Sequence, residues 1–307
     1  MTYQMAIIGY GGMGSWHHKK LAKGFEKIKV TGIYDICAES REKAAENGLY
    51  VYETAEALLA DSAIDLVLVA TPNNFHKPYV IAALEAGKNV ICEKPVAMNA
   101  AELEEMIAAA QRTGKLFSIH QNRRWDTDYC MVREILSKNL IGTPYFIESR
   151  VLGSRRAMHG WRSYKVNGGG MLLDWGVHLI DQALWLVDSP VVSVDANLQS
   201  IFSGEVDDSI KIVLRFENGI SYCMEMSTNC LVPQPRWHIS VTEKLSLCAR
   251  TAPCNGIMTL SIRRPAPHVQ WPRVRYIQCK SRHCRKSKAI ALLTMKTLPQ
   301  CWMVLKN

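Results

Sequence analysis

Short apolar runs alternate with longer polar–apolar segments along the first 121 residues. The apolar runs have the length and composition of buried strands, and the segments between them repeat apolar positions at helical spacing. They predict strands at 3–8, 29–34, 63–70, 89–93 and 116–120, and helices at 15–25, from about 38, at 76–86 and at 100–113. Strands that alternate with helices in this way predict an α/β domain built on a doubly wound parallel sheet.

After residue 121 the regular alternation of strands and helices ends, and several predicted strands follow one another. Further strands are predicted there at 144–152, 191–203, 208–217 and 219–228. We therefore expect two domains, one over residues 1–121 and one over residues 122–307. A length of 307 residues is sufficient for two domains, each with its own core.

A glycine-rich turn follows the first predicted strand and opens the first helix. Its spacing is Gly9-x-Gly11-x-x-Gly14. Gly9 permits the tight turn, Gly11 lets the backbone approach a pyrophosphate, and Gly14 allows the helix to pack closely on the strand. This pattern alone is a weak signal, but its place between strand and helix favours a dinucleotide-binding domain.

Asp35 ends the second predicted strand, about twenty residues past the last glycine, where an acidic side chain can bond both ribose hydroxyls of NAD. A carboxylate there would repel a 2′-phosphate, so NAD is favoured over NADP. Arg41 is close enough in sequence to leave dual use open. The alternative role for Asp35 is to cap the helix that begins near Ala38.

Two loops follow the third and fourth predicted strands. They are Thr71-Pro72-Asn73-Asn74 and Glu93-Lys94-Pro95. In doubly wound sheets the ligand lies beyond the carboxyl ends of the strands, so both loops should reach it. Pro95 disfavours helical geometry at Lys94, which predicts an extended lysine at a strand end.

The segment from Gly168 to Asp181 carries a carboxylate and an imidazole at helical spacing. Asp174 and His178 are four residues apart and should share one helix face, with Asp181 a further turn along near the same stripe. Histidine titrates near neutral pH, and a carboxylate can orient it and stabilise its charged form. The pair suits proton transfer, although such pairs are more often structural hydrogen bonds.

Taken in order, these motifs resemble the Gfo/Idh/MocA family of NAD(P)-dependent oxidoreductases, which includes glucose-fructose oxidoreductase and inositol dehydrogenase. The resemblance spans most of residues 5–181. It implies a Rossmann domain followed by an α+β domain with a large, mostly antiparallel sheet, whose outer face commonly packs against another subunit. It also implies that the cofactor contacts include Gly9, Tyr10, Gly11, Gly12, Met13, Gly14, Asp35, Thr71, Pro72, Asn73, His76, Glu93 and Lys94.

The resemblance further implies that Lys94, Asp174 and His178 are catalytic. Oxidising a secondary alcohol needs a base near the hydroxyl and a positive charge for the developing alkoxide. We expect His178 to be the base, Lys94 to stabilise the oxygen, and Asp174 to orient His178 or bond a neighbouring substrate hydroxyl. No metal is needed for this chemistry, and Asp174 and His178 lack further partners at metal-ligand spacing.

Arginine and tryptophan side chains flank these motifs. Arg123, Trp161 and Arg162 are expected, together with Asp174 and His178, to bind a polyhydroxylated small molecule, since guanidinium donors and aromatic faces suit such a ring. The alternative is ordinary packing and ion pairing. His17 and His18 are on the first predicted helix, where a solvated or capping role is the default.

Apolar run lengths and the cysteine pattern indicate the cellular compartment. The sequence has no apolar run of the length of a membrane span and no signal-peptide pattern, so we expect a cytoplasmic protein with no membrane partner. Its ten cysteines show no framework spacing and are expected to be reduced.

The net charge of +9 comes from the carboxyl-terminal segment. Residues 244–307 carry thirteen Lys and Arg and no Asp or Glu. The basic residues lack an interleaved aromatic platform, so a nucleic-acid partner is not favoured. The resemblance ends abruptly at Val241, and we hypothesise that residues 241–307 are the atypical product of a shifted reading frame, which would deprive the second sheet of its final strands and leave an edge exposed.

The sequence therefore predicts an NAD-dependent oxidoreductase for a sugar, inositol or related polyol, with a homo-oligomer possible. The alternative is a non-catalytic sensor that binds the dinucleotide without turnover, since the same fold serves a galactose-regulon repressor. The presence of Lys94, Asp174 and His178 favours the enzyme.

Overall fold

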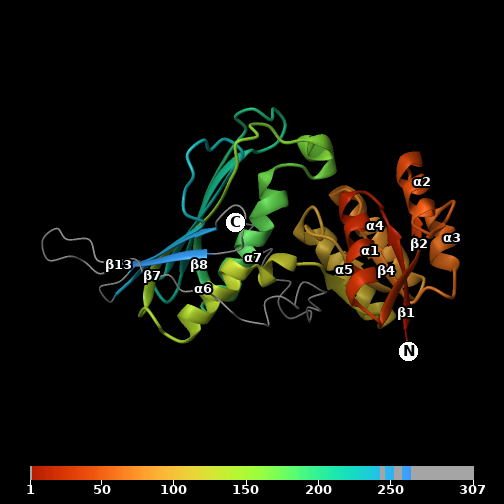
Figure 1. Cartoon of the computed structure of the whole chain (residues 1–307), viewed down its shortest axis with the longest axis horizontal. Coiled ribbons are helices and arrows are strands. Elements are labelled where there is room, and N and C mark those ends of the chain that lie inside the picture. The colour runs from red at the N-terminus through yellow and green to blue at the C-terminus, as the bar shows by residue number, and fades with distance from the viewer. Residues whose placement is uncertain (1, 243–245, 252–257, 264–307) are drawn as a thin grey trace, which may run out of the picture. The chain divides into compact units, whose positions relative to one another are not determined.

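The structure, a computed structural model, describes residues 2–242, 246–251 and 258–263 (Figure 1). Within these residues, 2–121 form one compact unit and those from Asn122 onward form a second. Each unit is built on its own β-sheet.

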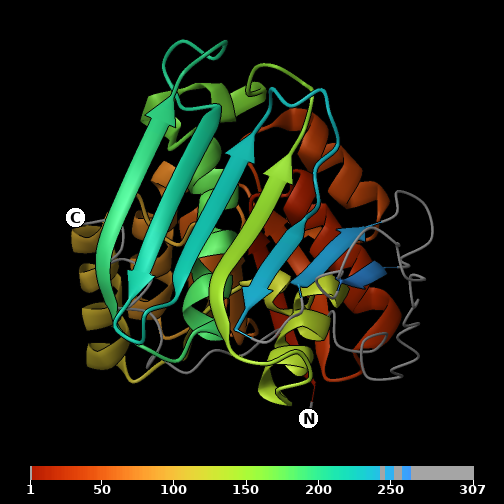
Figure 2. The ribbon, with the colours of Figure 1, turned by 90° about the vertical axis from the view of Figure 1, so that its left-hand side faces the viewer.

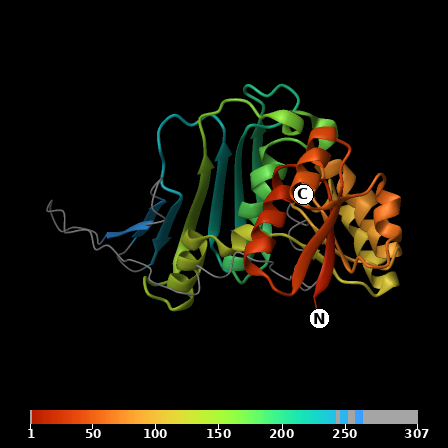
Figure 3. The same ribbon diagram turned by 45° about the vertical axis from the view of Figure 1, so that its right-hand side comes forward.

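The first unit contains six parallel strands in the order β3-β2-β1-β4-β5-β6, which is the doubly wound dinucleotide-binding order. Its red and orange elements come forward in Figure 3. The strands are β1 (Tyr3–Ile8), β2 (Ile28–Tyr34), β3 (Tyr50–Val51), β4 (Leu66–Val69), β5 (Asn89–Cys92) and β6 (Phe117–Ile119). The helices are α1 (Gly12–Gly24), α2 (Ala38–Glu46), α3 (Ala55–Ala60), α4 (His76–Glu85) and α5 (Ala100–Thr113), with a 3-10 turn η1 (Asn73–Phe75).

Apolar runs explain why these strands are central. All four residues of β4 are buried, as expected for a strand covered on both faces. Its side chains divide between two hydrophobic clusters, one containing Val67 and Val69 and the other Leu66 and Leu68. The doubly wound parallel sheet predicted from the sequence is confirmed.

The second unit contains a mostly antiparallel sheet of seven strands in the order β13-β12-β11-β7-β10-β9-β8, seen in Figure 2. Among the described strands of this sheet, only β7 and β10 pair in parallel. The strands are β7 (Pro144–Leu152), β8 (Val191–Gln199), β9 (Ser209–Phe216), β10 (Ser221–Ser227), β11 (Trp237–Val241), β12 (Ser246–Thr251) and β13 (Met258–Arg263). The helical segments are η2 (Asn122–Trp125), α6 (Thr127–Ser137), η3 (Gly160–Ser163), η4 (Lys165–Asn167), η5 (Leu172–Gly176) and α7 (Val177–Leu186).

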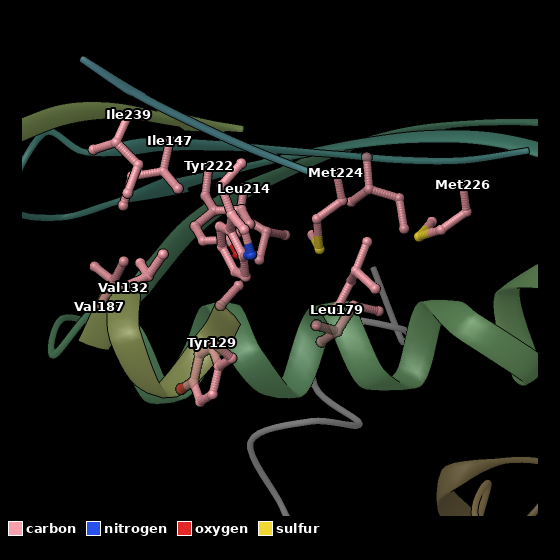
Figure 4. Close-up of a cluster of buried hydrophobic side chains, with 14 of the residues drawn as sticks. Tyr129, Val132, Ile147, Leu179, Val187, Leu214, Tyr222, Met224, Met226 and Ile239 are labelled. Atoms are coloured by element: carbon pink, nitrogen blue, oxygen red, sulfur yellow. The ribbon is translucent and has the colours of Figure 1, made fainter. Parts of the chain in front are cut away.

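One face of this sheet packs on helices α6 and α7. Figure 4 shows the labelled side chains of β7, β9, β10 and β11 pointing toward Tyr129 and Val132 of α6 and Leu179 of α7. Along β9 and β10 buried positions alternate with more exposed ones, so a single face of each strand enters the core. The α+β domain with a mostly antiparallel sheet is therefore confirmed.

The sheet does not stop where the family resemblance does. Strands β12 and β13 pair antiparallel beyond β11, so the expectation that the final strands are lost is wrong for residues 246–251 and 258–263. Most of the hypothesised frameshifted tail lies outside the described residues. Strand β8 ends at Gln199, before the predicted limit of 203.

A buried ion pair joins η2 to α7. Arg124 Nε donates to Asp181 Oδ2 at 2.7 Å, a second bond links Arg124 Nη2 to Asp181 Oδ1, and the guanidinium lies 3.8 Å from the centre of the Trp185 ring. Both charged side chains are 3% exposed. Asp181 is therefore a structural partner of Arg124.

Replacing Asp181 with Ala should destabilise the second unit by about 3–5 kcal/mol, because Arg124 would stay buried without its counter-charge. Urea unfolding followed by tryptophan fluorescence measures the change. The exposed Asp188, replaced by Ala, is the matched control and should stay within about 0.5 kcal/mol of the parent. Equal stability of the two variants would contradict this account.

Candidate active site

The glycine turn brings α1 close to the end of β1. Gly9 has a φ of +93°, and a Cβ there would lie 2.7 Å from Ala70 O. A Cβ on Gly14 would lie 2.0 Å from Gly9 O, whereas one on Gly11 would meet nothing within 4 Å. Packing therefore requires glycine at positions 9 and 14, whereas at Gly11 the space that a side chain would fill is empty.

Helix α1 begins at Gly12, and its first turn, which includes Met13, carries no acidic residue and no side-chain cap. Its amide groups and helix dipole are available to an anion. Together with the space above Gly11, this end of α1 fits the pyrophosphate of a dinucleotide.

Asp35 follows β2 and is held by two backbone amides. Its Oδ2 accepts from Tyr10 N at 2.6 Å, and its Oδ1 accepts from Cys37 N at 2.8 Å. The carboxylate therefore has a fixed orientation beside the glycine turn. The Tyr10 side chain is buried, and its hydroxyl lies 2.7 Å from His18 Nδ1, so Tyr10 reaches this site through its backbone.

The loop after β4 contains polar atoms without partners. Thr71 Oγ1 and Asn74 Oδ1 are buried and have no hydrogen-bond partner among the described residues. Buried polar atoms are rarely left unpaired, so these two are candidates for contact with a ligand. Pro72 precedes the short turn η1, and the side chain of Asn73 at its start is buried.

His76 connects this loop to the loop after β5. Its ring is fully buried, with Nδ1 2.7 Å from Pro95 O and Nε2 3.0 Å from Thr71 O. Burial lowers the pKa of His76, which favours the neutral ring. The structure thus places this residue, expected to contact the cofactor, between the two loops as their support.

Glu93 lies at the carboxyl end of β5 and is 5% exposed. One oxygen, Oε1, accepts from His17 Nε2 at 2.7 Å and from His120 Nδ1 at 3.0 Å. The expectation that His17 is solvated or caps a helix is wrong, because its side chain is buried and bonded to a residue 76 positions away. His120, which follows β6, is the third member of this group, and no local pattern in the sequence marks it.

The hydrogen bonds decide the charge of this group. Burial raises the pKa of Glu93, but the bonds from His120 and His17 outweigh burial and hold the pKa well below the usual range. Burial also lowers the pKa of His17. The three side chains have ligand atoms within 4.8 Å of one another. As hydrogen-bond donors, both nitrogens carry protons that a metal would have to displace.

Lys94 follows Glu93 and is half-buried. Its backbone amide lies 3.3 Å from Glu93 Oε2, and the Lys94–Pro95 peptide bond is cis. The lysine is therefore attached to a backbone segment that Glu93 and His76 hold from two sides.

In the second unit, Asp174 lies in a π-helical turn, η5, that leads directly into α7 and His178. The sequence predicted an ordinary helix here, and π turns of this kind are frequent at functional sites. His178 is 2% exposed, and its ring centre lies 5.8 Å from that of Trp175. Asp174 Oδ1 lies 3.2 Å from Arg162 Nε.

The predicted substrate residues of this unit gather around the same turn. The Arg162 guanidinium lies 4.3 Å from the centre of the Trp161 ring, and that of Arg123 lies 4.0 Å from the centre of the Trp175 ring. The structure therefore brings Arg162, Trp161 and Asp174 together, and Arg123 is one aromatic ring away from His178.

The glycine triplet before η5 packs against two other segments. A Cβ on Gly169 would lie 2.2 Å from Arg162 O, and one on Gly170 would lie 2.5 Å from Asp207 Oδ1. Asp207 Oδ2 accepts from Leu172 N at 2.7 Å and so fixes the start of the helix. Asp207 was not foreseen, because no local pattern connects it to a turn 35 residues earlier.

Two family models match consecutive parts of the chain. The model described as "Oxidoreductase family, NAD-binding Rossmann fold" matches residues 3–121, and that described as "GFO/IDH/MocA C-terminal domain" matches residues 129–245. The chain belongs to the Gfo/Idh/MocA family of oxidoreductases.

Individual relatives agree with this assignment. An uncharacterised oxidoreductase of Schizosaccharomyces pombe is 35% identical over 69% of this chain and 59% of its own length. The scyllo-inositol 2-dehydrogenase (NADP(+)) IolW of Bacillus subtilis is 33% identical over 65% of this chain and 55% of its own. Among solved structures, an NAD-binding protein from Listeria innocua is 45% identical, with a TM-score of 0.81 over 87% of this chain and 75% of that chain.

The chain spans 55–60% of the length of three curated relatives that it matches. Across the described residues, none of the helices has the length and apolar character needed to cross a membrane.

Gly14→Ala and Gly11→Ala should separate packing from ligand space. The Cβ on Gly14 must displace the backbone of Gly9, so this variant should lower the melting temperature of the cofactor-free protein. Gly11→Ala should leave that temperature unchanged and weaken dinucleotide binding only. Differential scanning calorimetry and a cofactor titration measure the two effects, and equal loss of stability in both variants would contradict the assignment.

Proposed function

We propose that this protein is an NAD-dependent dehydrogenase that interconverts a secondary alcohol and a carbonyl on a sugar, inositol or related polyol. The observation that carries the proposal is the fixed cradle of the first unit, where Gly9 to Gly14 and the Asp35 carboxylate meet through the bond from Tyr10 N. The name of the Bacillus subtilis relative, an inositol dehydrogenase, supports the substrate class.

The residues present fit a dinucleotide. The start of α1 suits the pyrophosphate, Asp35 suits the adenosine ribose, and the unpaired Thr71 Oγ1 and Asn74 Oδ1 suit polar groups farther along the cofactor. NAD is favoured because the Asp35 carboxylate would repel a 2′-phosphate. The name of the Bacillus subtilis relative specifies NADP, so the affinities of this protein for NAD and NADP should be measured directly.

Bound nicotinamide would supply the hydride acceptor or donor. His178 takes the hydroxyl proton as the carbon–hydrogen bond breaks and the carbonyl forms. Its burial beside Trp175 limits solvent access to that proton. Lys94 stabilises the negative charge that develops on the substrate oxygen.

Asp174 and Arg162 give the second unit a charged pair with both donor and acceptor capacity. A polyol presents hydroxyl groups that donate and accept, so the pair can bond neighbouring hydroxyls of one substrate. Arg123 and the face of Trp161 add a donor and an apolar surface. These residues fit a polyhydroxylated ring better than a simple aliphatic alcohol.

His178→Asn and Lys94→Met should each lower kcat by a factor of about 10²–10⁴, because each removes a group that acts on the reacting oxygen. NAD affinity should survive in His178→Asn. Turnover is followed by the absorbance of reduced nicotinamide across a panel of inositols and hexoses. The exposed His159 and Lys29, changed in the same way, are the matched controls.

Undiminished turnover in both variants would remove these residues from the mechanism. A parent protein that binds NAD but oxidises no member of the panel and reduces no corresponding ketone would instead support the sensor.

Asp35→Ser should shift the preference between the cofactors. Loss of the carboxylate removes a repulsive charge from the 2′-phosphate, so the affinity for NADP relative to NAD should rise on the order of tenfold. Titration of the free protein with each cofactor measures the ratio. The exposed Glu39, replaced by Ser, tests whether a nearby surface charge has the same effect. An unchanged ratio in Asp35→Ser would show that Asp35 does not select the cofactor.

A further inference from the structure

A buried carboxylate in the first unit is connected to three segments that approach the cofactor cradle. Glu93 follows β5, His17 is on α1 three residues past Gly14, and His120 follows β6. Both imidazoles donate to Glu93 Oε1, and the three side chains are 3–7% exposed. The three side chains of this group are therefore held in place by hydrogen bonds and are shielded from solvent.

Its hydrogen bonds define its charge. Each histidine supplies one N–H to the carboxylate, which a neutral imidazole can do. These two bonds hold the pKa of Glu93 well below its usual range and so favour the ionised form. With neutral rings, the group carries one negative charge. Charges away from water are screened little, so this one acts over a longer range than a surface carboxylate.

The position of Glu93 in the sheet determines which part of a bound dinucleotide its charge would affect. In the order 3-2-1-4-5-6 the β1–β2 half holds the adenosine end of a dinucleotide, and the β4–β6 half holds the nicotinamide end. Asp35 follows β2, whereas Glu93 and His120 follow β5 and β6. The nicotinamide ring is cationic when oxidised and neutral when reduced, so a nearby fixed anion interacts differently with the two forms.

We propose that Glu93, held by His17 and His120, is a fixed negative charge that makes the site bind oxidised nicotinamide dinucleotide more tightly than the reduced form. This inference rests on the proposed cofactor but requires no turnover. Glu93 acts here through its charge, and the two histidines act as positioning residues. A purely structural role would support both redox forms of the cofactor equally.

The test compares NAD+ and NADH binding in the parent and in Glu93→Gln, which keeps the side-chain shape and removes the charge. Isothermal titration calorimetry gives both dissociation constants. For charges about 10 Å apart at an effective dielectric constant of about 20, the ratio Kd(NAD+)/Kd(NADH) should rise on the order of tenfold in the variant. Glu105→Gln removes an exposed carboxylate of the same unit and should leave the ratio unchanged.

A ratio that is unchanged in Glu93→Gln, with both forms still bound, would overturn the inference and leave the proposed function intact. Failure of the parent to bind either form would overturn both. A rise of the ratio in Glu105→Gln equal to that in Glu93→Gln would also contradict a specific role of the buried charge.

A second variant keeps the inference testable if Glu93→Gln does not fold. His17→Phe removes one donor, so the carboxylate should gain a proton more easily. As the pH is lowered, the ratio Kd(NAD+)/Kd(NADH) should therefore rise at a higher pH in His17→Phe than in the parent, because the carboxylate of the variant becomes protonated first. A flat ratio in both proteins would count against the proposal.

Discussion

The close approach of α1 to the end of β1 is the constraint from which the cofactor cradle follows. Space for a Cβ is absent at Gly14, so the helix starts directly against the turn at Gly9. This contact fixes where the N-terminus of α1 lies relative to the end of β1. It also sets the position of His17, which is about one helical turn after Gly14. His17 in turn reaches Glu93, so the first helix and the backbone of Lys94 are linked through a single carboxylate. A change at the glycine turn therefore affects the placement of groups far from it in the sequence.

In the second unit, glycines likewise allow close backbone packing where the helical segment η5 begins. Gly169 lies against the backbone of Arg162, and Gly170 lies against the Asp207 carboxylate. Asp207 binds the amide of Leu172, so the turn that carries Asp174 begins at a fixed point. In both units glycine allows a close approach, and a carboxylate from a distant segment then fixes the backbone. Rigid placement of this kind is what a site for proton and hydride transfer requires.

Much of the architecture could be predicted because it depends on local patterns. Period and turn signals identify the strands and helices of the first unit, and the glycine spacing marks its ligand-binding edge. The roles of His17, His120 and Asp207 could not be predicted in this way. Their partners lie 76, 27 and 35 residues away, and only the folded sheet brings them together. The pairing of Asp181 with Arg124, 57 residues earlier, could not be predicted for the same reason.

The buried anion proposed to lie near the nicotinamide would affect two parts of a catalytic cycle. Tighter binding of the oxidised cofactor shifts the equilibrium on the protein toward the alcohol, because binding and reaction are linked. The reduced ring is neutral and gains no such attraction, so the reduced cofactor is released more easily than the oxidised one. In the mechanism proposed above, the Lys94 ammonium stabilises the alkoxide from which the hydride leaves and so assists loss of the hydroxyl proton. Under the two proposals, adjacent residues at one strand end thus have separate tasks: the Glu93 carboxylate retains the oxidised cofactor, and the Lys94 ammonium favours formation of the reactive alkoxide.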